Sequence, residues 1–462
     1  MKVTLSNLGV LHQAELEVGD LTIICGSNNT GKTYITYALY GFLRTYARFL
    51  KLDVDDVQID ELLSKGVIRI DLREYAEKAN ALLERACKTY TRSFPSIFAS
   101  QAKYFEGSRF NVSLNKEPSI ESVYEHIIGT PKKGMISLMK EQSDPYLVIS
   151  LLTEERKIDI PETTIADVIR RSIGEIIFGN SIPDVFISSA ERTGAVIFQK
   201  ELDFSRNRLL DQMASDKAVD PLKLLFQSYR TYAMPVKDNV DFTRNIGDFT
   251  KRNSFIAEKH NELLKDFNSL IGGQYEVRKK MNDELFYKPR GSQRKLTMGE
   301  SSSSVRSLMD IGFYLKHLAK PGDMLMIDEP ELNLHPENQR RLARLFVGLV
   351  NVGVKVFITT HSDYIVKELN TLIMLRNNRE KDHVKQLIAE EGYKEIELLD
   401  QNRVKVYVAK KKLAAVEGSP RKKRRNVLVA AKITPEYGIE ADSFDDTIDK
   451  MNAIQDRIMW GD

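Results

Sequence analysis

Short, uninterrupted apolar runs indicate strands that are buried on both faces. They are LTIIC at residues 21–25, MLMI at 324–327 and VKVFITT at 354–360, and DVFISS at 184–189 has the same character. Strands of this composition are typical of a parallel sheet that is covered by helices, because neither face of such a sheet meets water. The pattern therefore predicts an α/β domain.

The N-terminal stretch from residue 2 to residue 25 reads as strands, and most of the chain between the buried strands has a helical period. An example is LREYAEKANALLERACKTY at 72–90, although FNVSLN at 110–115 and PYLVISLL at 145–152 read as a strand pair. We predict a main domain made of residues 1–42, 184–204 and 274–375, mainly helical insertions at 43–183 and 205–273, and a hairpin and helix at 376–462.

Composition narrows the class of protein without naming a function. The 462 residues are 42% hydrophobic and 29% charged with a net charge of +3, which is ordinary for a globular protein of about two to three domains. Two cysteines support neither a disulfide framework nor a cysteine zinc site, so a reducing, cytoplasmic location is expected. No membrane span and no signal peptide are expected either.

Residues 26–33, GSNNTGKT, match the phosphate-loop pattern G-x-x-x-x-G-K-[ST] between a buried strand and a helix. Glycines let successive N–H groups turn inward around an anion, and the helix N-terminus adds a positive dipole end. Lys32 would contact the outer phosphates, and the Thr33 hydroxyl could ligate Mg²⁺. The residues expected to bind nucleotide are Gly26, Ser27, Asn28, Asn29, Thr30, Gly31, Lys32, Thr33 and Tyr34.

Two further strand ends carry candidate catalytic residues. Asp328 and Glu329 follow one buried strand, where neighbouring carboxylates point in opposite directions. Asp328 is assigned to the Mg²⁺ and Glu329 to the attacking water, a division suited to in-line phosphoryl transfer from ATP. His361 follows the third strand, where a neutral imidazole could contact the γ-phosphate or the water. Ordinary capping acids and a loop histidine are the alternatives.

GSNNTGKT, IDEPELNLHP and TTHS, in this order, resemble the ABC-type ATPase heads of the SMC, RecF and OLD group within the AAA family. The opening segment LSNLGVLHQAELEV is similar to the first, antiparallel strands of those heads. The resemblance implies a P-loop NTPase head with a mixed central sheet, interrupted by an insertion. It also implies ATP and Mg²⁺ as ligands, and a homodimer or higher oligomer that holds ATP between its copies.

The resemblance gives a role to the serines at 301–304, which alone would read as a linker. In these ATPases a signature segment at a helix start contacts the γ-phosphate held by the partner copy. Ser302, Ser303 and Arg306 are the candidates here, although the family's usual glycines are absent from the run. The alternative is a capped amphipathic helix with no such contact.

FISSAERTGA lies where these folds couple nucleotide to the helical insertion. Gln199, or the pair Glu191 and Arg192, could fill that position, and an ordinary strand-to-helix turn is an equal alternative.

The biological role is less determined by the sequence. Compact heads of this kind resemble the ATPases of Septu, retron-associated and PARIS-like antiphage systems, which implies a separately encoded nuclease or toxin as partner. A RecF- or SMC-like role in DNA repair or maintenance, and a slow ATP-dependent scaffold, are the alternatives. Lys410–Lys412 and Arg421–Arg425 form a basic patch on an expected hairpin, which could bind DNA or RNA or be a solvated loop tip.

Overall fold

The computed structural model describes the chain except for residues 53–55, 131–132, 153–161, 198–231, 279–283, 417–418, 435–437, 441–451 and 460–462. The described residues divide into two compact units. The smaller unit comprises residues 1–4, 42–92 and 109–184, and the larger comprises residues 5–41, 93–108 and 185–462.

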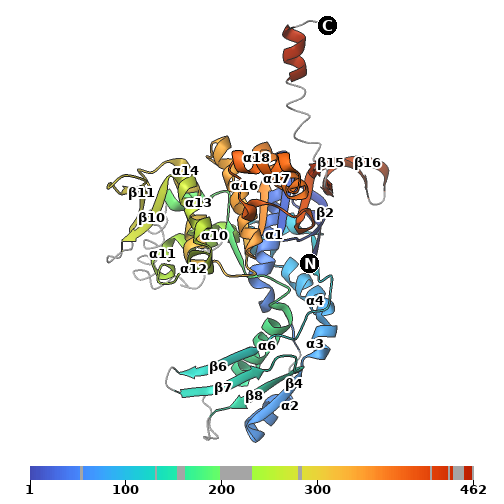
Figure 1. The fold of residues 1–462 in the computed structure, drawn as a ribbon. Coiled ribbons are helices and arrows are strands. Elements are labelled where there is room, and N and C mark those ends of the chain that lie inside the picture. Colours follow the sequence, from blue (N-terminus) through green and yellow to red (C-terminus); the bar gives the residue numbers. More distant parts are fainter. Residues whose placement is uncertain are drawn as a thin grey trace, which may run out of the picture. The chain divides into compact units, whose positions relative to one another are not determined.

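The larger unit contains most of a mixed sheet whose strands lie in the order β1-β2-β16-β15-β3-β14-β13-β9 (Figure 1). They are β1 (Lys2–Leu8), β2 (Leu11–Glu17), β3 (Leu21–Gly26), β9 (Val185–Ser188), β13 (Met324–Asp328), β14 (Lys355–Thr360), β15 (Val404–Val416) and β16 (Ser419–Ala430). From β15 to β9 every neighbouring pair is parallel. The predicted α/β ATPase fold with a mixed sheet is confirmed.

The C-terminal segment completes this sheet beside the phosphate-loop strand. β15 pairs with β3 in parallel, which sets Ala409 opposite Gly26. A Cβ at position 26 would lie 2.4 Å from the carbonyl oxygen of Ala409, and Gly26 has φ +135°. Only glycine fits this position without strain. The sequence predicted the hairpin of β15 and β16, but not that β15 would lie within the ATPase sheet.

Helices and small sheets surround the main sheet of the larger unit. The helices are α1 (Lys32–Thr45), α5 (Phe94–Ile97), η2 (Ala102–Phe105), α7 (Arg192–Ile197), α10 (Met234–Arg244), α11 (Ile246–Phe249), α12 (Phe255–Lys259), α13 (Asn261–Ile271), α14 (Ser303–Ser307), α15 (Met309–Phe313), the π-helical η3 (Tyr314–Leu318), α16 (Pro336–Asn351), α17 (Asp363–Asn378), α18 (Asp382–Glu390), η4 (Glu395–Glu397) and η5 (Gln401–Arg403). The remaining strands are β10 (Gly273–Arg278), β11 (Glu284–Pro289), β12 (Leu296–Thr297), β17 (Lys432–Thr434) and β18 (Gly438–Glu440).

Apolar side chains of the parallel strands and of the helices pack into one buried cluster. Ile23 of β3, Leu325 of β13 and Ile358 of β14 belong to it, together with Leu345 of α16 and Ile373 of α17. The all-buried strands that the apolar runs predicted therefore form the centre of the larger unit. Burial of such side chains contributes about 25 cal/mol per Å² of apolar surface.

The smaller unit lies mostly within the first predicted insertion and contains both helices and strands. It contains α2 (Asp56–Lys65), α3 (Arg73–Glu77), α4 (Ala79–Thr91), α6 (Glu162–Phe178) and η1 (Tyr46–Arg48), with strands β4 (Val67–Asp71), β5 (Arg109–Ser113), β6 (Tyr124–Thr130), β7 (Lys133–Lys140) and β8 (Tyr146–Leu151). Four of the strands form an antiparallel sheet in the order β4-β8-β7-β6. Ile127 of β6 is exposed, and so is Val123 just before this strand.

In the second predicted insertion, residues 205–231 lie outside the described residues, and the rest contains α10 to α13. The helix expected near the C-terminus is described only at residues 452–459. None of the helices that the structure describes has the length and apolar character that crossing a bilayer requires.

Candidate functional site

The predicted site residues of the phosphate loop and of the two strand ends come together at one edge of the sheet. β3, β13 and β14 are adjacent and parallel, so their carboxyl ends lie side by side. The register sets Asp328 opposite Thr359, and Thr360 opposite Cys25. Ligands of α/β proteins bind outside this edge of a parallel sheet.

The phosphate loop runs from the end of β3 to the start of α1. Asn29 and Gly31 have φ of +60° and +99°, which turns the backbone as a cradle for an anion requires. The Lys32 ammonium is buried and donates hydrogen bonds of 2.9 Å to the carbonyls of Gly26 and Ser27. Burial lowers the pKa of Lys32, and the carboxylates of Glu329 and Asp328 oppose that shift. The ammonium thus lies where it can meet a phosphate.

Asp328 is fully buried at the end of β13, and its Oδ1 accepts a hydrogen bond from the Thr359 hydroxyl. Its Oδ2 is buried without a hydrogen-bond partner among the described residues. Burial raises the pKa of Asp328 to about 6, and the hydrogen bond from Thr359 opposes this shift. A buried, unpaired carboxylate oxygen beside a threonine hydroxyl fits Mg²⁺, which takes few protein oxygens and keeps its waters.

Glu329 follows Asp328 in the left-handed backbone region, with φ +52°. A non-glycine residue there is strained by about 1–3 kcal/mol and is held by its surroundings. The Glu329 N–H donates to the carbonyl of Thr359 over 3.0 Å. Its carboxylate lies 3.2 Å from His361 Nε2, and this hydrogen bond lowers the pKa of Glu329.

His361 stands between the carboxylate and the lysine. Its Nδ1 is 3.5 Å from the Lys32 ammonium, while its Nε2 faces Glu329. A neutral ring with the proton on Nε2 would donate to Glu329 and accept from Lys32. The imidazole can therefore orient the carboxylate and respond to a charge placed beside Lys32.

Arg192 is a buried residue that ties this site to the serine segment. Its guanidinium donates to the carbonyls of Asp328 and Glu329, each over 2.8 Å, and to that of Ser189 over 2.9 Å. Its Nε donates to the carbonyl of Ser307 in α14 over 2.6 Å. The sequence suggests Arg192 only as part of a pair with Glu191 that couples nucleotide to the insertion. Gln199, the other candidate, lies outside the described residues, and Glu191 accepts a hydrogen bond from Tyr37 over 2.8 Å.

Sequence reasoning missed Glu331, which fixes the loop after β14. Its carboxylate accepts from the His361 N–H over 2.5 Å and from the Thr360 hydroxyl over 2.9 Å. Burial raises the pKa of Glu331, and these hydrogen bonds oppose the shift. The only sign of this role in the sequence is that Glu331 is acidic and lies two positions beyond Glu329.

The serine segment caps a helix, as predicted. This helix is interrupted, because α14 ends at Ser307 and α15 begins at Met309. Ser302 accepts a hydrogen bond from the Val305 N–H at the start of α14, and both Ser302 and Ser303 are exposed. The guanidinium of Arg306 turns back onto the carbonyls of Met298 and Ser301. Among the described residues, no hydrogen bond joins these serines to the phosphate loop of the same chain.

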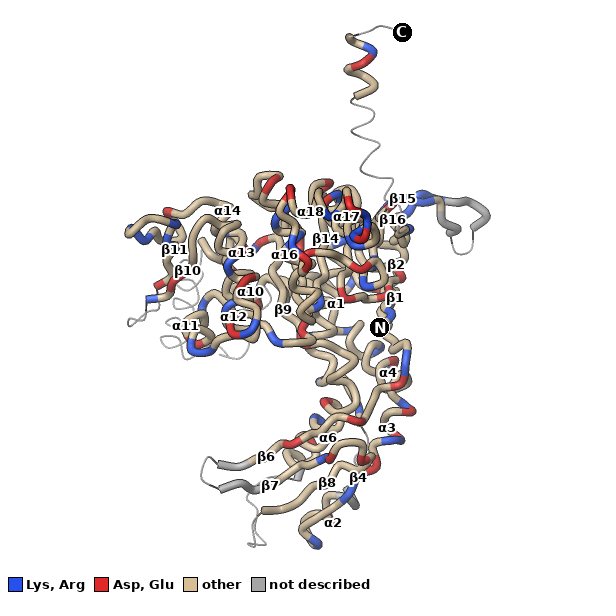
Figure 2. The backbone as a smooth tube through the Cα atoms, in the orientation of Figure 1, with Lys and Arg blue, Asp and Glu red and all other residues tan. Residues whose placement is uncertain are grey.

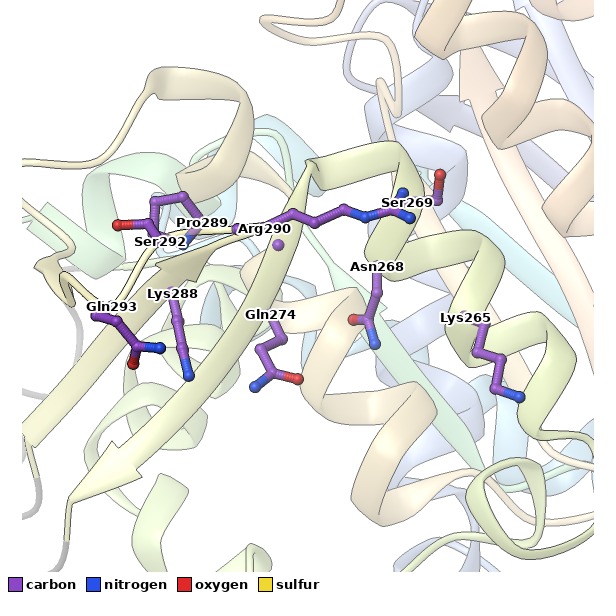
Figure 3. A pocket seen from close by; sticks show the side chains of 11 residues that line it. Lys265, Asn268, Ser269, Gln274, Lys288, Pro289, Arg290, Ser292 and Gln293 are labelled. Carbon is purple, nitrogen blue, oxygen red and sulfur yellow. The ribbon is translucent and has the colours of Figure 1, made fainter.

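A separate pocket lies between α13 and the ends of β10 and β11 (Figure 3). It measures about 650 Å³ and is lined by polar and cationic side chains, among them Lys265, Lys288 and Arg290. None of the predicted site residues lines it, so it is separate from the edge where the strand ends meet.

Residues 1–366 match the family described as "AAA ATPase domain". The chain belongs to this family. The match spans the phosphate loop, Asp328 at the end of β13, Glu329 after it, and His361. None of the curated proteins matches the chain.

Solved structures of SMC heads are similar over nearly the full length. An Smc head bound to the C-terminal winged-helix domain of ScpA is 12% identical, with 93% of this chain and 97% of that chain covered and a TM-score of 0.34. The Pyrococcus furiosus Smc head bound to the C-terminal domain of ScpA is 11% identical, with 98% of each chain covered and a TM-score of 0.34. The Thermotoga maritima SMC head is 11% identical, with 94% and 98% covered and a TM-score of 0.32.

The buried Asp310 yields a test of the electrostatics around Arg192. Burial raises the pKa of Asp310 to about 7, and Arg192 opposes the shift. The folded state then holds a proton up to about pH 7 that the unfolded chain releases near pH 4, so stability falls as pH rises through this window. The free energy of unfolding, measured with urea, should decrease between pH 5 and pH 8 in the wild type. We expect this decrease to be smaller by a few kcal/mol in Asp310→Asn.

Some slope should remain in this variant, because the pKa of Asp328 is raised in the same direction. The fully exposed position 382 supplies the matched control, Asp382→Asn. Equal pH slopes for wild type, Asp310→Asn and the control would contradict the assignment of a protonated Asp310.

Proposed function

We propose that this chain hydrolyses ATP with Mg²⁺, and that two copies close around the bound nucleotide. The observation that supports the proposal most is the convergence of Lys32, Asp328, Glu329 and His361 at the carboxyl ends of adjacent strands. A phosphate-loop lysine, a buried carboxylate and a more exposed carboxylate are the groups that phosphoryl transfer to water requires.

Each residue has a separate task in this reaction. Residues 26–34 and the Lys32 ammonium bind the phosphates, while Thr33 and Asp328 would hold Mg²⁺, which neutralises charge on the phosphate oxygens. Glu329 has a depressed pKa, so it is ionised and can accept a proton from the attacking water. His361 orients that carboxylate over 3.2 Å.

The partner copy would supply the exposed Ser302 and Ser303 to the γ-phosphate. Arg306 fits this role less well, since its guanidinium is engaged with carbonyls of its own loop. The alternative, a slow scaffold whose serines only cap α14, would bind ATP without nucleotide-dependent dimers.

We further propose that ATP-driven closure regulates a separate effector, a nuclease or toxin, in antiphage defence. The support is the sequence resemblance of the phosphate loop, IDEPELNLHP and TTHS to the ATPases of such systems. Free, buried Cys25 and Cys87 suit the reducing cytoplasm that this role requires. Purification with the product of a neighbouring gene, which is toxic when released, would distinguish this role from DNA repair.

The alternative of a RecF- or SMC-like DNA-maintenance ATPase gains support from the hairpin of β15 and β16 (Figure 2). The register sets Lys412 directly opposite Arg425, with Lys410 and Lys423 on the same face. None of these four makes an ion pair among the described residues. Like charges directly opposite each other destabilise a strand pair, and a bound polyanion such as nucleic acid would relieve the repulsion. The side chains of Arg421 and Lys422 lie outside the described residues.

The ATPase proposal predicts different outcomes for two substitutions. Lys32→Ala should lose ATP binding, because the phosphates lose their buried point charge. Glu329→Gln should bind Mg²⁺ and ATP but turn over at least a hundredfold slower, and should accumulate as dimers in sedimentation velocity with ATP. The exposed Glu380→Gln is the matched control. Full turnover by Glu329→Gln would overturn the catalytic assignment.

The nucleic-acid alternative predicts salt-dependent binding that depends on the hairpin. Replacement of Lys410, Lys412, Lys423 and Arg425 by Gln should weaken binding of a fluorescent DNA duplex at least tenfold and flatten its salt dependence. The control variant instead replaces Lys65, Lys78 and Lys88. These lysines are already paired with Glu61, Glu74 and Glu84, respectively. Equal DNA affinity for both variants would remove the support that the hairpin gives.

A further inference from the structure

An aromatic pocket adjoins the phosphate loop within the larger unit. It measures about 530 Å³, which is within the range of small-molecule pockets, about 300–1,000 Å³. Thr33, Tyr34 and Tyr37 of α1 line one part of it, and Gly9 of the β1–β2 turn lines another. The rest comes from residues 98–105 and from Ala233, which are far away in the sequence.

The walls of this pocket are ring faces that pack on one another. Phe98 lies 5.4 Å from Tyr34 and 5.3 Å from Phe105, centroid to centroid, the second pair being stacked. The Tyr34 ring covers Gly9, where a Cβ would lie 2.3 Å from the ring and where φ is +56°. Tyr104 leaves 59% of its surface exposed at the rim. The pocket therefore offers apolar, π-rich surface that a flat ligand would cover.

Thr33 belongs both to this pocket and to the phosphate loop, so a nucleotide held by its phosphates lies within reach of the rings. We propose that the aromatic pocket of Tyr34, Phe98, Tyr104 and Phe105 binds the base of the nucleotide by stacking. This inference rests on the proposed ATP binding and adds the residues that receive the base. Segment 93–108, which contains α5 and η2, then serves as a binding element of the larger unit.

The polar groups of the pocket are too few to read the edge of a base. The Tyr37 hydroxyl donates to Glu191 and Thr33 is assigned to Mg²⁺, which leaves the hydroxyls of Tyr34, Ser100 and Tyr104 among the lining side chains. Selection between bases needs several directed hydrogen bonds, whereas stacking accepts every base because each has a π face. The site should therefore bind ATP and GTP with affinities within about tenfold of each other.

The test compares ATP, GTP and inorganic tripolyphosphate as Mg²⁺ complexes by calorimetry with the full chain. Tyr104→Ala should weaken ATP and GTP about tenfold, since stacking on one ring is worth roughly 1–3 kcal/mol, and should leave tripolyphosphate unchanged. Tyr104→Phe keeps the ring and should bind ATP as wild type does. Tyr146→Ala, at a partly exposed ring of the smaller unit, is the control for loss of a tyrosine.

The outcomes separate this inference from the proposed function. Unchanged ATP affinity in Tyr104→Ala, with wild type binding ATP, would overturn the aromatic site and leave the ATPase intact. Discrimination against GTP of a hundredfold or more would overturn recognition by stacking alone. Failure of wild type to bind either ATP or tripolyphosphate would overturn the ATPase proposal itself.

Discussion

The arrangement of the site depends on one buried guanidinium. Arg192 donates hydrogen bonds to carbonyls at the ends of β9 and β13 and to Ser307 in α14, so it joins elements that are far apart in the sequence. Burial lowers the pKa of this arginine, and nearby Asp310 opposes the shift. Without these donors the carbonyls would be buried and unpaired, which costs about 1–3 kcal/mol for each group.

This constraint explains how a strained residue stays in place. Glu329 keeps its positive φ because its N–H and its carbonyl are both held, by Thr359 and Arg192. The same guanidinium reaches α14, whose first turn carries the exposed serines. The geometry of the carboxylate and that of the serine segment are therefore linked through one side chain, a connection that nucleotide at a dimer interface could use.

Local patterns predicted the parts of the site that lie within single stretches of sequence. The phosphate loop, Asp328, Glu329 and His361 each follow a buried apolar strand, and parallel strands must bring their carboxyl ends together. Contacts between segments that are far apart in the sequence have no such local pattern. The residues around Phe98 do not indicate its contact with Tyr34, and those around Val404 do not indicate that β15 lies beside β3. In residues 43–183, the sequence likewise indicated β8 but not its sheet partners β4, β6 and β7.

The most direct test of the central claim is the turnover number of Arg192→Lys, measured together with its ATP affinity. Lysine keeps the charge but cannot donate to four carbonyls in a fixed fork. The account predicts ATP affinity within about threefold of wild type and turnover lower by about a hundredfold, because a displacement near 1 Å at the carboxylate is enough for such a loss. Turnover equal to that of wild type, in a variant that folds and binds ATP, would contradict it.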